Sequence, residues 1–175
     1  MYMTKKVNGF TLLEMVIAIV IAAIVMTGAS YLLVQGFRGY YLGRDAIATD
    51  WQARIAMERM TRDMRAIRST NDIATAGTSV FTFNDVSGNN ITYQLSGAQL
   101  VRILNSTTTN VLATNVTSLS FTYYDVNGIA LTSLPLSSAN RKLVRYIVPL
   151  LQVTYSKSSF GSYQIAGGIY PWNLQ

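Results

Sequence analysis

A single glutamate lies in the most apolar part of this chain. From Phe10 to Phe37 the only charged side chain is that of Glu14. By insertion-type scales, a carboxylate inside a membrane-spanning helix costs on the order of 2.5–3.5 kcal/mol. We therefore expect Glu14 to have a partner, and the chemistry available to this residue is ion pairing.

The sequence contains neither cysteine nor histidine. Their absence excludes disulfides, Ser-His and Cys-His nucleophilic centres, histidine general bases and ordinary zinc sites. An enzyme built from this chain would have to use carboxylates, lysines or tyrosines. We expect no catalytic residue, no cofactor, no cofactor-binding residue and no metal ligand.

Two pairs of Asp and Asn residues are the remaining candidates for a cation site. Asn84 adjoins Asp85, and Asn127 follows Asp125 closely. Calcium takes about six to eight oxygen ligands, usually from several carboxylates. Because carboxylates are few and scattered here, turn formation is the favoured interpretation, and a calcium site stays open.

The formal net charge is +6. Such an excess would favour a nucleic-acid partner if the basic residues clustered without acids. Asp50, Glu58 and Asp63 instead lie among the arginines at helical spacing, which is typical of a solvated helix face. No nucleic-acid partner is directly indicated.

The apolar run is the element that must hold Glu14. Lys5 and Lys6 precede it and Arg38 follows it. Its length exceeds the roughly 20 residues that cross a ~30 Å hydrocarbon core. A plain membrane anchor fits this length but leaves Glu14 unexplained. A secretory signal peptide is less favoured, because the run continues past its small residues at 27–29 and begins with an acid.

A helical pattern continues beyond the apolar run. Apolar residues recur there at spacings of three and four, which predicts an amphipathic helix; they are Ala53, Met57, Met60, Met64 and Ile67. Opposite charges stand four residues apart in Asp50/Arg54, Glu58/Arg62 and Arg59/Asp63. Each such pair adds only about 0.2–0.5 kcal/mol, so we expect the stripe to pack against the chain's own head.

From about Ser69 onward, strand-like segments alternate with turn residues. The segments are 80–83, 91–95, 100–104, 119–124 and 143–155, and residues 167–172 are interpreted as loop. Residues that tolerate positive φ separate several of them, which predicts antiparallel pairing. Pro149 cannot donate to a ladder, so we expect it at an edge, a bulge or a strand break.

The residues around Glu14 form a motif. The sequence Gly9-Phe10-Thr11-Leu12-Leu13-Glu14 after a short basic leader resembles the processing site of type IV prepilins and pseudopilins. The resemblance implies that a membrane peptidase cuts between Gly9 and Phe10 and that the new amino group of Phe10 is methylated. Lys5 and Lys6 would hold the leader in the cytoplasm. Glu14 would pair with the Phe10 ammonium of a neighbouring subunit and set its register.

The rest of the chain shows a looser resemblance. Residues 57–65, 93–102 and 111–123 look like the PilW-like minor pilins and the J-type minor pseudopilins of type II secretion. Minor pilins of mannose-sensitive haemagglutinin (MSHA) type pili fit about as well, so the subgroup stays open. The implied fold is α+β and pilin-like, with a long N-terminal helix packed on an antiparallel β-sheet head.

This resemblance implies a domain order and a location. We expect a cytoplasmic leader at 1–9, a transmembrane half-helix at 10–37, an amphipathic periplasmic stalk helix at 38–68 and a β-rich head at 69–175. The chain would cross the bacterial inner membrane once, with its leader cytoplasmic and its head periplasmic. It could also reach the tip of a pilus or pseudopilus.

The expected function is that of a structural subunit. A minor pilin or minor pseudopilin precursor would prime or cap assembly of a type IV pilus or of a type II secretion pseudopilus. The implied partners are other pilin or pseudopilin subunits, the prepilin peptidase and methyltransferase, the membrane assembly platform and inner-membrane lipid. A major filament subunit is the alternative, and a membrane-anchored envelope enzyme is a weaker one.

Overall fold

The computed structural model describes residues 9–155 and 161–171, so Lys5, Lys6 and Trp172 lie outside the described residues. Its first element is α1, an uninterrupted α-helix over Leu12–Arg65. The chain divides into two compact units, Met1–Gly43 and Arg44–Gln175. In the N-terminal unit, the α1 side chains as far as Tyr41 are exposed.

In the C-terminal unit, the amphipathic pattern of α1 is confirmed. Its buried side chains are those of Thr49, Ala53, Ala56, Met57, Met60 and Met64. The helix ends at Arg65, and the N–H groups of Ala66 and Ile67 donate to the carbonyls three residues before them, which tightens the last turn. Ile67 is also buried and bridges to Asp85. A short 3₁₀ helix, η1 (Thr70–Asp72), leads into the sheets.

The first sheet is an antiparallel meander of five strands in the order β1-β2-β3-β4-β5. Its strands are β1 (Ile73–Ala76), β2 (Phe81–Asn84), β3 (Asn90–Ser96), β4 (Gln99–Leu104) and β5 (Thr108–Ala113). Two-residue connections suit residues with positive φ. Gly97, in the two-residue turn between β3 and β4, has φ +60°. The expected antiparallel pairing is confirmed.

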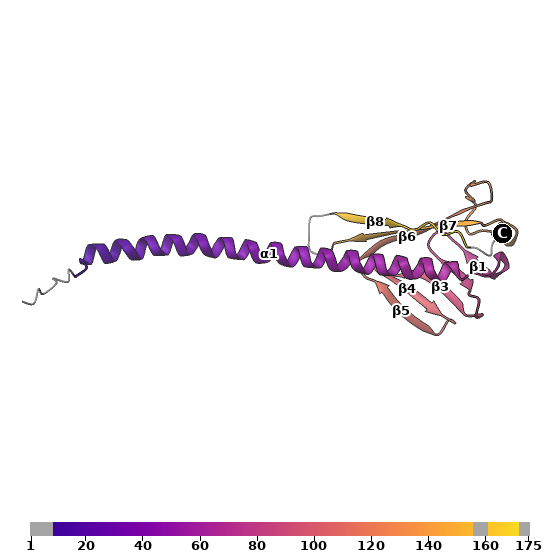
Figure 1. Cartoon of the computed structure of the whole chain (residues 1–175), viewed down its shortest axis with the longest axis horizontal. Helices are drawn as coiled ribbons and strands as arrows, with labels where there is room; N and C mark the ends of the chain where they lie inside the picture. Colours follow the sequence, from indigo (N-terminus) through magenta and orange to yellow (C-terminus); the bar gives the residue numbers. More distant parts are fainter. Residues whose placement is uncertain (1–8, 156–160, 172–175) are drawn as a thin grey trace, which may run out of the picture. The chain divides into compact units, whose positions relative to one another are not determined.

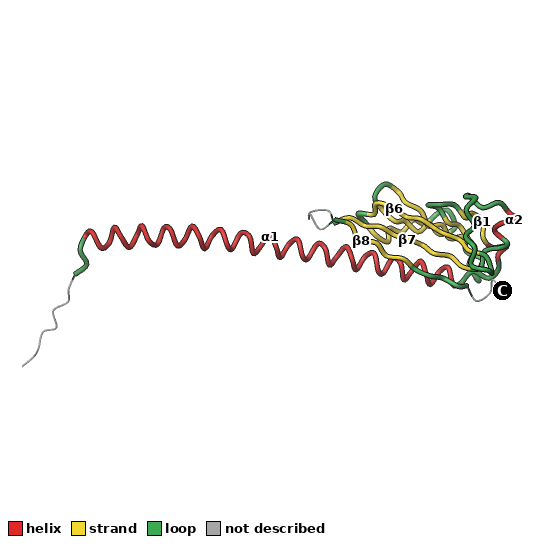
Figure 2. The backbone as a smooth tube through the Cα atoms, turned by 90° about the horizontal axis from the view of Figure 1, so that it is seen from above, coloured by secondary structure: helices red, strands yellow, loops and turns green. Residues whose placement is uncertain are grey.

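The second sheet has three antiparallel strands in the order β6-β7-β8. They are β6 (Val116–Tyr124), β7 (Tyr146–Thr154) and β8 (Ser162–Ala166), and the long connection from β6 to β7 contains α2 (Ser138–Arg141). Figure 2 shows α2 beside β1, where the N–H of Leu136 donates to the carbonyl of Ala76. The chain after β8 returns to the sheet, because Ile169 is buried and bridges to Ile147. Residues 167–171 form a loop, as expected, and this loop is fixed to the sheet at Ile169.

The expectation for Pro149 was wrong. Pro149 lies inside β7, the central strand of its sheet, opposite Phe121 and without a break in register. Its carbonyl accepts a hydrogen bond from the N–H of Gly167. The Pro149 nitrogen faces this same side, just past the end of β8 at Ala166. Proline has no N–H to donate, but the pairing of β7 with β8 ends at Leu150 and Ala166, so no ladder hydrogen bond is lost at Pro149. This position therefore tolerates proline.

The C-terminal part of α1 completes the core of the head. Figure 1 shows it running along both sheets, with β3, β4 and β5 on one side and β6, β7 and β8 on the other. Aromatic rings join the sheets behind it, since the ring of Phe81 lies 5.6 Å from that of Phe121 and 5.7 Å from that of Tyr123. The result is a pilin-like α+β fold, a long N-terminal helix packed against antiparallel β-sheets.

Candidate functional site

The peptide bond between Gly9 and Phe10 lies outside the helix. Both residues are exposed and precede α1, which begins at Leu12. No atom lies within 4 Å of the position that a Cβ on Gly9 would occupy. A protease needs its substrate backbone in an accessible, non-helical form. The local structure therefore leaves this bond open to cleavage.

Thr11 caps the first turn of α1. Its hydroxyl oxygen accepts a hydrogen bond from the N–H of Glu14 at 3.3 Å, and its carbonyl accepts from the N–H of Met15 at 3.2 Å. Helix N-termini leave their first N–H groups without partners, and a threonine before the first turn satisfies one of them. Cleavage after Gly9 would leave this cap in place.

Glu14 is the acidic residue of the first helical turn. A negative charge is favourable there because the unpaired N–H groups make the helix start partly positive. The Glu14 side chain is exposed, and among the described residues its carboxylate has neither a hydrogen bond nor an ion pair. The helix thus offers this carboxylate to another molecule.

α1 is long and apolar enough to cross a membrane. Among the described residues it is the one helix that meets this criterion, which rests on length and composition alone. Its N-terminal side chains from Leu12 to Val34 are exposed and almost all apolar. Such a surface needs either lipid or other apolar helices around it.

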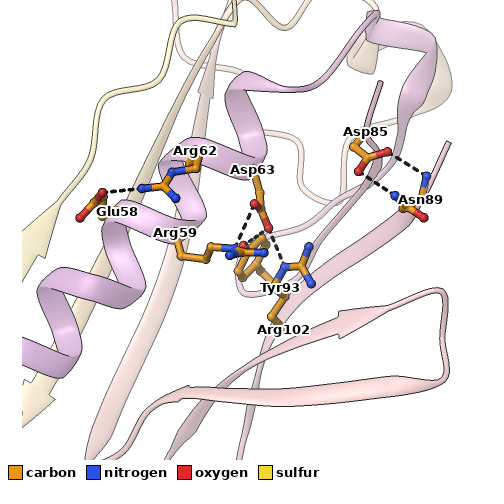
Figure 3. A network of polar contacts seen from close by, with 8 residues as sticks. All are labelled: Glu58, Arg59, Arg62, Asp63, Asp85, Asn89, Tyr93 and Arg102. Carbon is orange, nitrogen blue, oxygen red and sulfur yellow. Dashed lines mark hydrogen bonds and ion pairs between the residues drawn. The ribbon is translucent and has the colours of Figure 1, made fainter. Parts of the chain in front are cut away.

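A second polar site joins α1 to the first sheet (Figure 3). One carboxylate oxygen of Asp63, Oδ2, accepts hydrogen bonds from Nε of Arg102 on β4 at 2.6 Å and from the hydroxyl of Tyr93 on β3 at 2.8 Å. The other, Oδ1, lies 3.2 Å from Nε of Arg59. The expected Arg59/Asp63 pair is therefore present, but the Asp63 side chain is only 10% exposed and faces the head.

Burial and charge shift the proton affinities in this network. Burial, reinforced by the Asp63 carboxylate, raises the pKa of Tyr93 far above its usual value. Burial alone would lower the pKa of Arg102, but its hydrogen bond to Asp63 raises it above the usual range. Tyr93 is therefore neutral, Arg102 is permanently charged, and the Asp63 carboxylate accepts from both. This arrangement holds α1 against β3 and β4, and it offers no labile proton for catalysis.

Other contacts fix both flanks of α1 to the head. On the first-sheet side, the hydroxyl of Thr114 donates to the side-chain oxygen of Gln52 at 3.0 Å. On the other side, the Tyr155 hydroxyl donates to Asp50 at 2.9 Å, and the Arg54 guanidinium lies 5.8 Å from the centre of the Tyr163 ring. Asp50 and Arg54 thus bind residues of the head, and the expected Asp50/Arg54 pair is replaced by these contacts.

Asp85 and Asp125 each stabilise the turn in which they lie. The Asp85 carboxylate accepts from the N–H groups of Ser87 and Asn89 and from the Asn89 amide. Although burial opposes it, these bonds lower the pKa of Asp85. Asp125 accepts from the N–H groups of Asn127 and Ile129 in the same way. Within 9–155 and 161–171, His, Cys, Asp and Glu side chains form no group of three or more that could hold a metal ion.

The N-terminal sequence matches a known family model. Residues 4–30 match the model of the prokaryotic N-terminal methylation motif. This methylation motif includes Gly9, Phe10, Thr11 and Glu14, and it extends into α1. A comparison with curated proteins gave no match to the chain. By its N-terminus and its fold, the chain is a type IV pilin-like or pseudopilin-like protein.

The methylation motif carries general consequences. It implies processing by a prepilin peptidase and assembly with pilins. Together with the apolar helix, it indicates a bacterial protein associated with a membrane or a pilus. Proteins of this pilin-like kind are structural and generally non-enzymatic.

Two features of these sites were not anticipated from the sequence. The capping role of Thr11 could have been predicted, because Thr11-Leu12-Leu13-Glu14 has the threonine and glutamate spacing of a helix capping box. The contact of Asp63 with Arg102 had no such signal, because 39 residues separate them. Only the pairing of β3 with β4 and their packing on α1 bring these side chains together.

Proposed function

We propose that this chain is the precursor of a minor pilin or minor pseudopilin. It acts as a structural subunit that primes or caps assembly of a type IV pilus or a type II secretion pseudopilus. Residues 1–9 are a cytoplasmic leader, 10–37 cross the inner membrane, 38–68 form the periplasmic stalk and 69–175 form the periplasmic head. The looser resemblance of stalk and head to minor subunits supports the minor role.

Processing creates the group on which assembly depends. The prepilin peptidase cuts between Gly9 and Phe10, the new amino group of Phe10 is methylated, and Lys5 and Lys6 keep the leader on the cytoplasmic side. The exposed, non-helical backbone at Gly9 and Phe10 supports this step. Methylation keeps the amino group positively charged. The product is a cation immediately before the helix cap.

The carboxylate of Glu14 carries the proposal. It is exposed in the first turn of α1 and has no partner among the described residues. In an apolar medium a lone carboxylate is costly, whereas a close pair of opposite charges is far less so. The Glu14 carboxylate therefore pairs with the Phe10 ammonium of a neighbouring subunit. A subunit docked at another height would leave both charges unpaired.

The experiment separates processing from assembly. Glu14→Gln keeps the size of the side chain and removes its charge, while Glu14→Asp keeps the charge. We expect both variants to insert and to give the mature N-terminus by mass spectrometry. Incorporation into the filament or tip complex should be lost in Glu14→Gln and partly retained in Glu14→Asp. Normal incorporation of Glu14→Gln would contradict the role of the carboxylate.

The minor role has its own test. A primer or cap is present in a few copies per filament, whereas a major subunit makes up most of the filament mass. Quantitative mass spectrometry of purified filaments gives this ratio directly. A chain that accounts for most of the filament protein would instead be the major subunit.

A further inference from the structure

A small polar hollow lies at the end of the head where α1 ends. Its volume is about 60 Å³. One wall comes from η1 and the start of β1, and the other comes from α2, which Figure 2 shows beside β1. The hollow is lined by Thr70, Asn71, Ile73, Ser138, Arg141 and Lys142. These residues and the space between them are called the basic hollow below.

The side chains of the basic hollow are mostly hydrogen-bond donors. Arg141 and Lys142 are cations, Thr70 and Ser138 carry hydroxyls, and Asn71 carries an amide. Among the described residues, the side chains of Thr70, Asn71, Ser138 and Lys142 have no hydrogen-bond partner. No lining residue is acidic. Two positive charges and three neutral donors therefore converge on one small space.

Both walls of the basic hollow are held in place by the fold. Leu136 and Val144 flank α2 and are buried, and the N–H of Leu136 donates to β1 at 2.8 Å. Nη1 of Arg141 donates to the carbonyl of Leu136 at 3.3 Å, which leaves its other N–H groups available. On the opposite wall, the Ser69 hydroxyl caps η1 by accepting from the N–H of Asn71 at 3.2 Å. A preorganised site loses little conformational entropy when its ligand binds.

The charges around the basic hollow leave it positive. Nη1 of Arg145 donates to the carbonyl of Lys142 at 2.9 Å, so a third cation adjoins the site. The nearest acid in the sequence is Asp72, whose Oδ1 lies 3.4 Å from Nη2 of Arg68. The Asp72 side chain is 14% exposed and does not line the hollow. Since Arg68 compensates this carboxylate, the site attracts anions.

We propose that the basic hollow binds one tetrahedral oxyanion of the phosphate class, either free phosphate or the end of a phosphomonoester. A phosphate group on a side chain carries about −1.5 to −2 charges at pH 7, which matches the two lining cations. Roughly 10–15 Å³ of such space holds one water molecule, so about 60 Å³ accommodates about four or five heavy atoms, the size of one phosphate group.

The donors also suit phosphate chemically. Arginine binds phosphate through two parallel N–H bonds, and lysine binds it as a point charge. The hydroxyls of Thr70 and Ser138 and the amide of Asn71 can donate to the remaining oxygens. The bound oxyanion would join α2 to η1 and stabilise this end of the head. The site lies wholly within the head, so it does not depend on the pairing of Glu14.

Calorimetric titration of the full chain in detergent with potassium phosphate, at constant ionic strength, tests the proposal. We expect one site per chain. Arg141→Gln combined with Lys142→Gln should abolish binding. Arg62→Gln combined with Arg65→Gln is the matched control, because it removes the same charge from exposed positions of α1 outside the hollow. This control should bind phosphate as the natural chain does.

Ser138→Ala separates a shaped site from general attraction between charges. It changes no charge, and Ser138 is exposed, so the head should unfold at the natural temperature in chloride. The Kd for phosphate should rise about fivefold, the loss expected for one hydrogen bond. An unchanged Kd in Ser138→Ala, or equal weakening in the two double variants, would show charge attraction alone and overturn the proposal.

Competing anions identify the class and source of the ligand. Acetate should bind more weakly than phosphate, and equal binding of the two would overturn the assignment to a tetrahedral oxyanion. Absence of any phosphate binding would overturn the site itself and leave the role of Glu14 intact. Glycerol phosphate that competes with phosphate would support the site and extend it to phosphomonoesters. Phosphate binding without such competition would support it for the free ion alone.

Discussion

The carboxylate of Asp63 on α1 and the guanidinium of Arg102 on β4 are joined by a hydrogen bond of 2.6 Å, and both side chains are only 10% exposed. Arg59 and Tyr93 complete the environment of the carboxylate. This buried contact ties the helix that bears the methylation motif to the first sheet. The C-terminal part of α1 therefore belongs to the same compact unit as the two sheets.

Asp63→Asn should destabilise the head strongly. The substitution leaves the Arg102 charge buried without a counter-charge, and breaking one side of a buried pair costs about 3–5 kcal/mol. Urea unfolding of the full chain in detergent, followed by near-ultraviolet circular dichroism, measures this loss. Glu58→Gln is the control, because its ion pair with Arg62 is exposed and should cost no more than about 1 kcal/mol. Similar losses in both variants would contradict the role of Asp63.

Alkaline pH should lower the free energy of unfolding of the head, because the pKa of Tyr93 is higher in the folded chain than in the unfolded one. The pKa of a tyrosine is ordinarily 10.0, and that of Tyr93 is raised in the fold. Above about pH 10 the unfolded chain releases this proton while the folded chain keeps it, so stability is complete below pH 10 and falls as the pH rises. Tyr93→Phe should make the fall in stability with rising pH less steep. Part of the fall should remain, because burial raises the pKa of Tyr123 too. Melting temperatures from pH 8 to pH 11 test this, and an unchanged slope would contradict it.

Gly167→Ala should loosen the contact between α1 and the end of the chain. An added Cβ would lie 2.9 Å from Sδ of Met57 and 3.2 Å from Oγ1 of Thr61. Overpacking of this kind costs about 1–3 kcal/mol. Gly43→Ala is the control, because its Cβ meets no atom within 4 Å. The prediction fails if the thermal unfolding of the head is the same in the two variants.

Thr11→Ala should fray the first turn of α1. It removes the acceptor of the Glu14 N–H, a loss worth about 0.5–2 kcal/mol. Hydrogen exchange at the Glu14 amide should become faster in detergent-solubilised protein. Thr11→Ser keeps the hydroxyl and should exchange at the natural rate. Equal exchange in the alanine and serine variants would exclude a capping role.

Periodicity predicted the parts of the fold that depend on a long, regular pattern. The stripe from Ala53 to Ile67 is buried as expected, since helical spacing alone places those residues on one face. The strongest strand patterns are also present as β2, β3, β4, β6 and β7. Turn chemistry also predicted the Asp85 and Asp125 turns, because each carboxylate and the N–H groups that donate to it are close in sequence.

The remaining elements depend on contacts that a single sequence does not reveal. β1, β5 and β8 were not anticipated, and all three are edge strands: β1 and β5 alternate little, and β8 alternates between exposed and half-buried positions without a buried face. The Pro149 error had a similar origin, since its position is acceptable only because β8 ends at Ala166. For the candidate sites, Gly9, Phe10 and Glu14 came from a local motif. The buried surroundings of Asp63 required the tertiary structure.

The close approach of Gly167 to Met57 and Thr61 affects the timing of folding. Synthesis produces α1 first and the residues that close over it almost last. Contacts between such distant segments form slowly, because a long loop must close before they are made. The buried side of α1, from Ala53 to Met64, therefore stays uncovered until nearly the whole chain has been synthesised. During that interval the nascent protein is most exposed to proteases and to premature association.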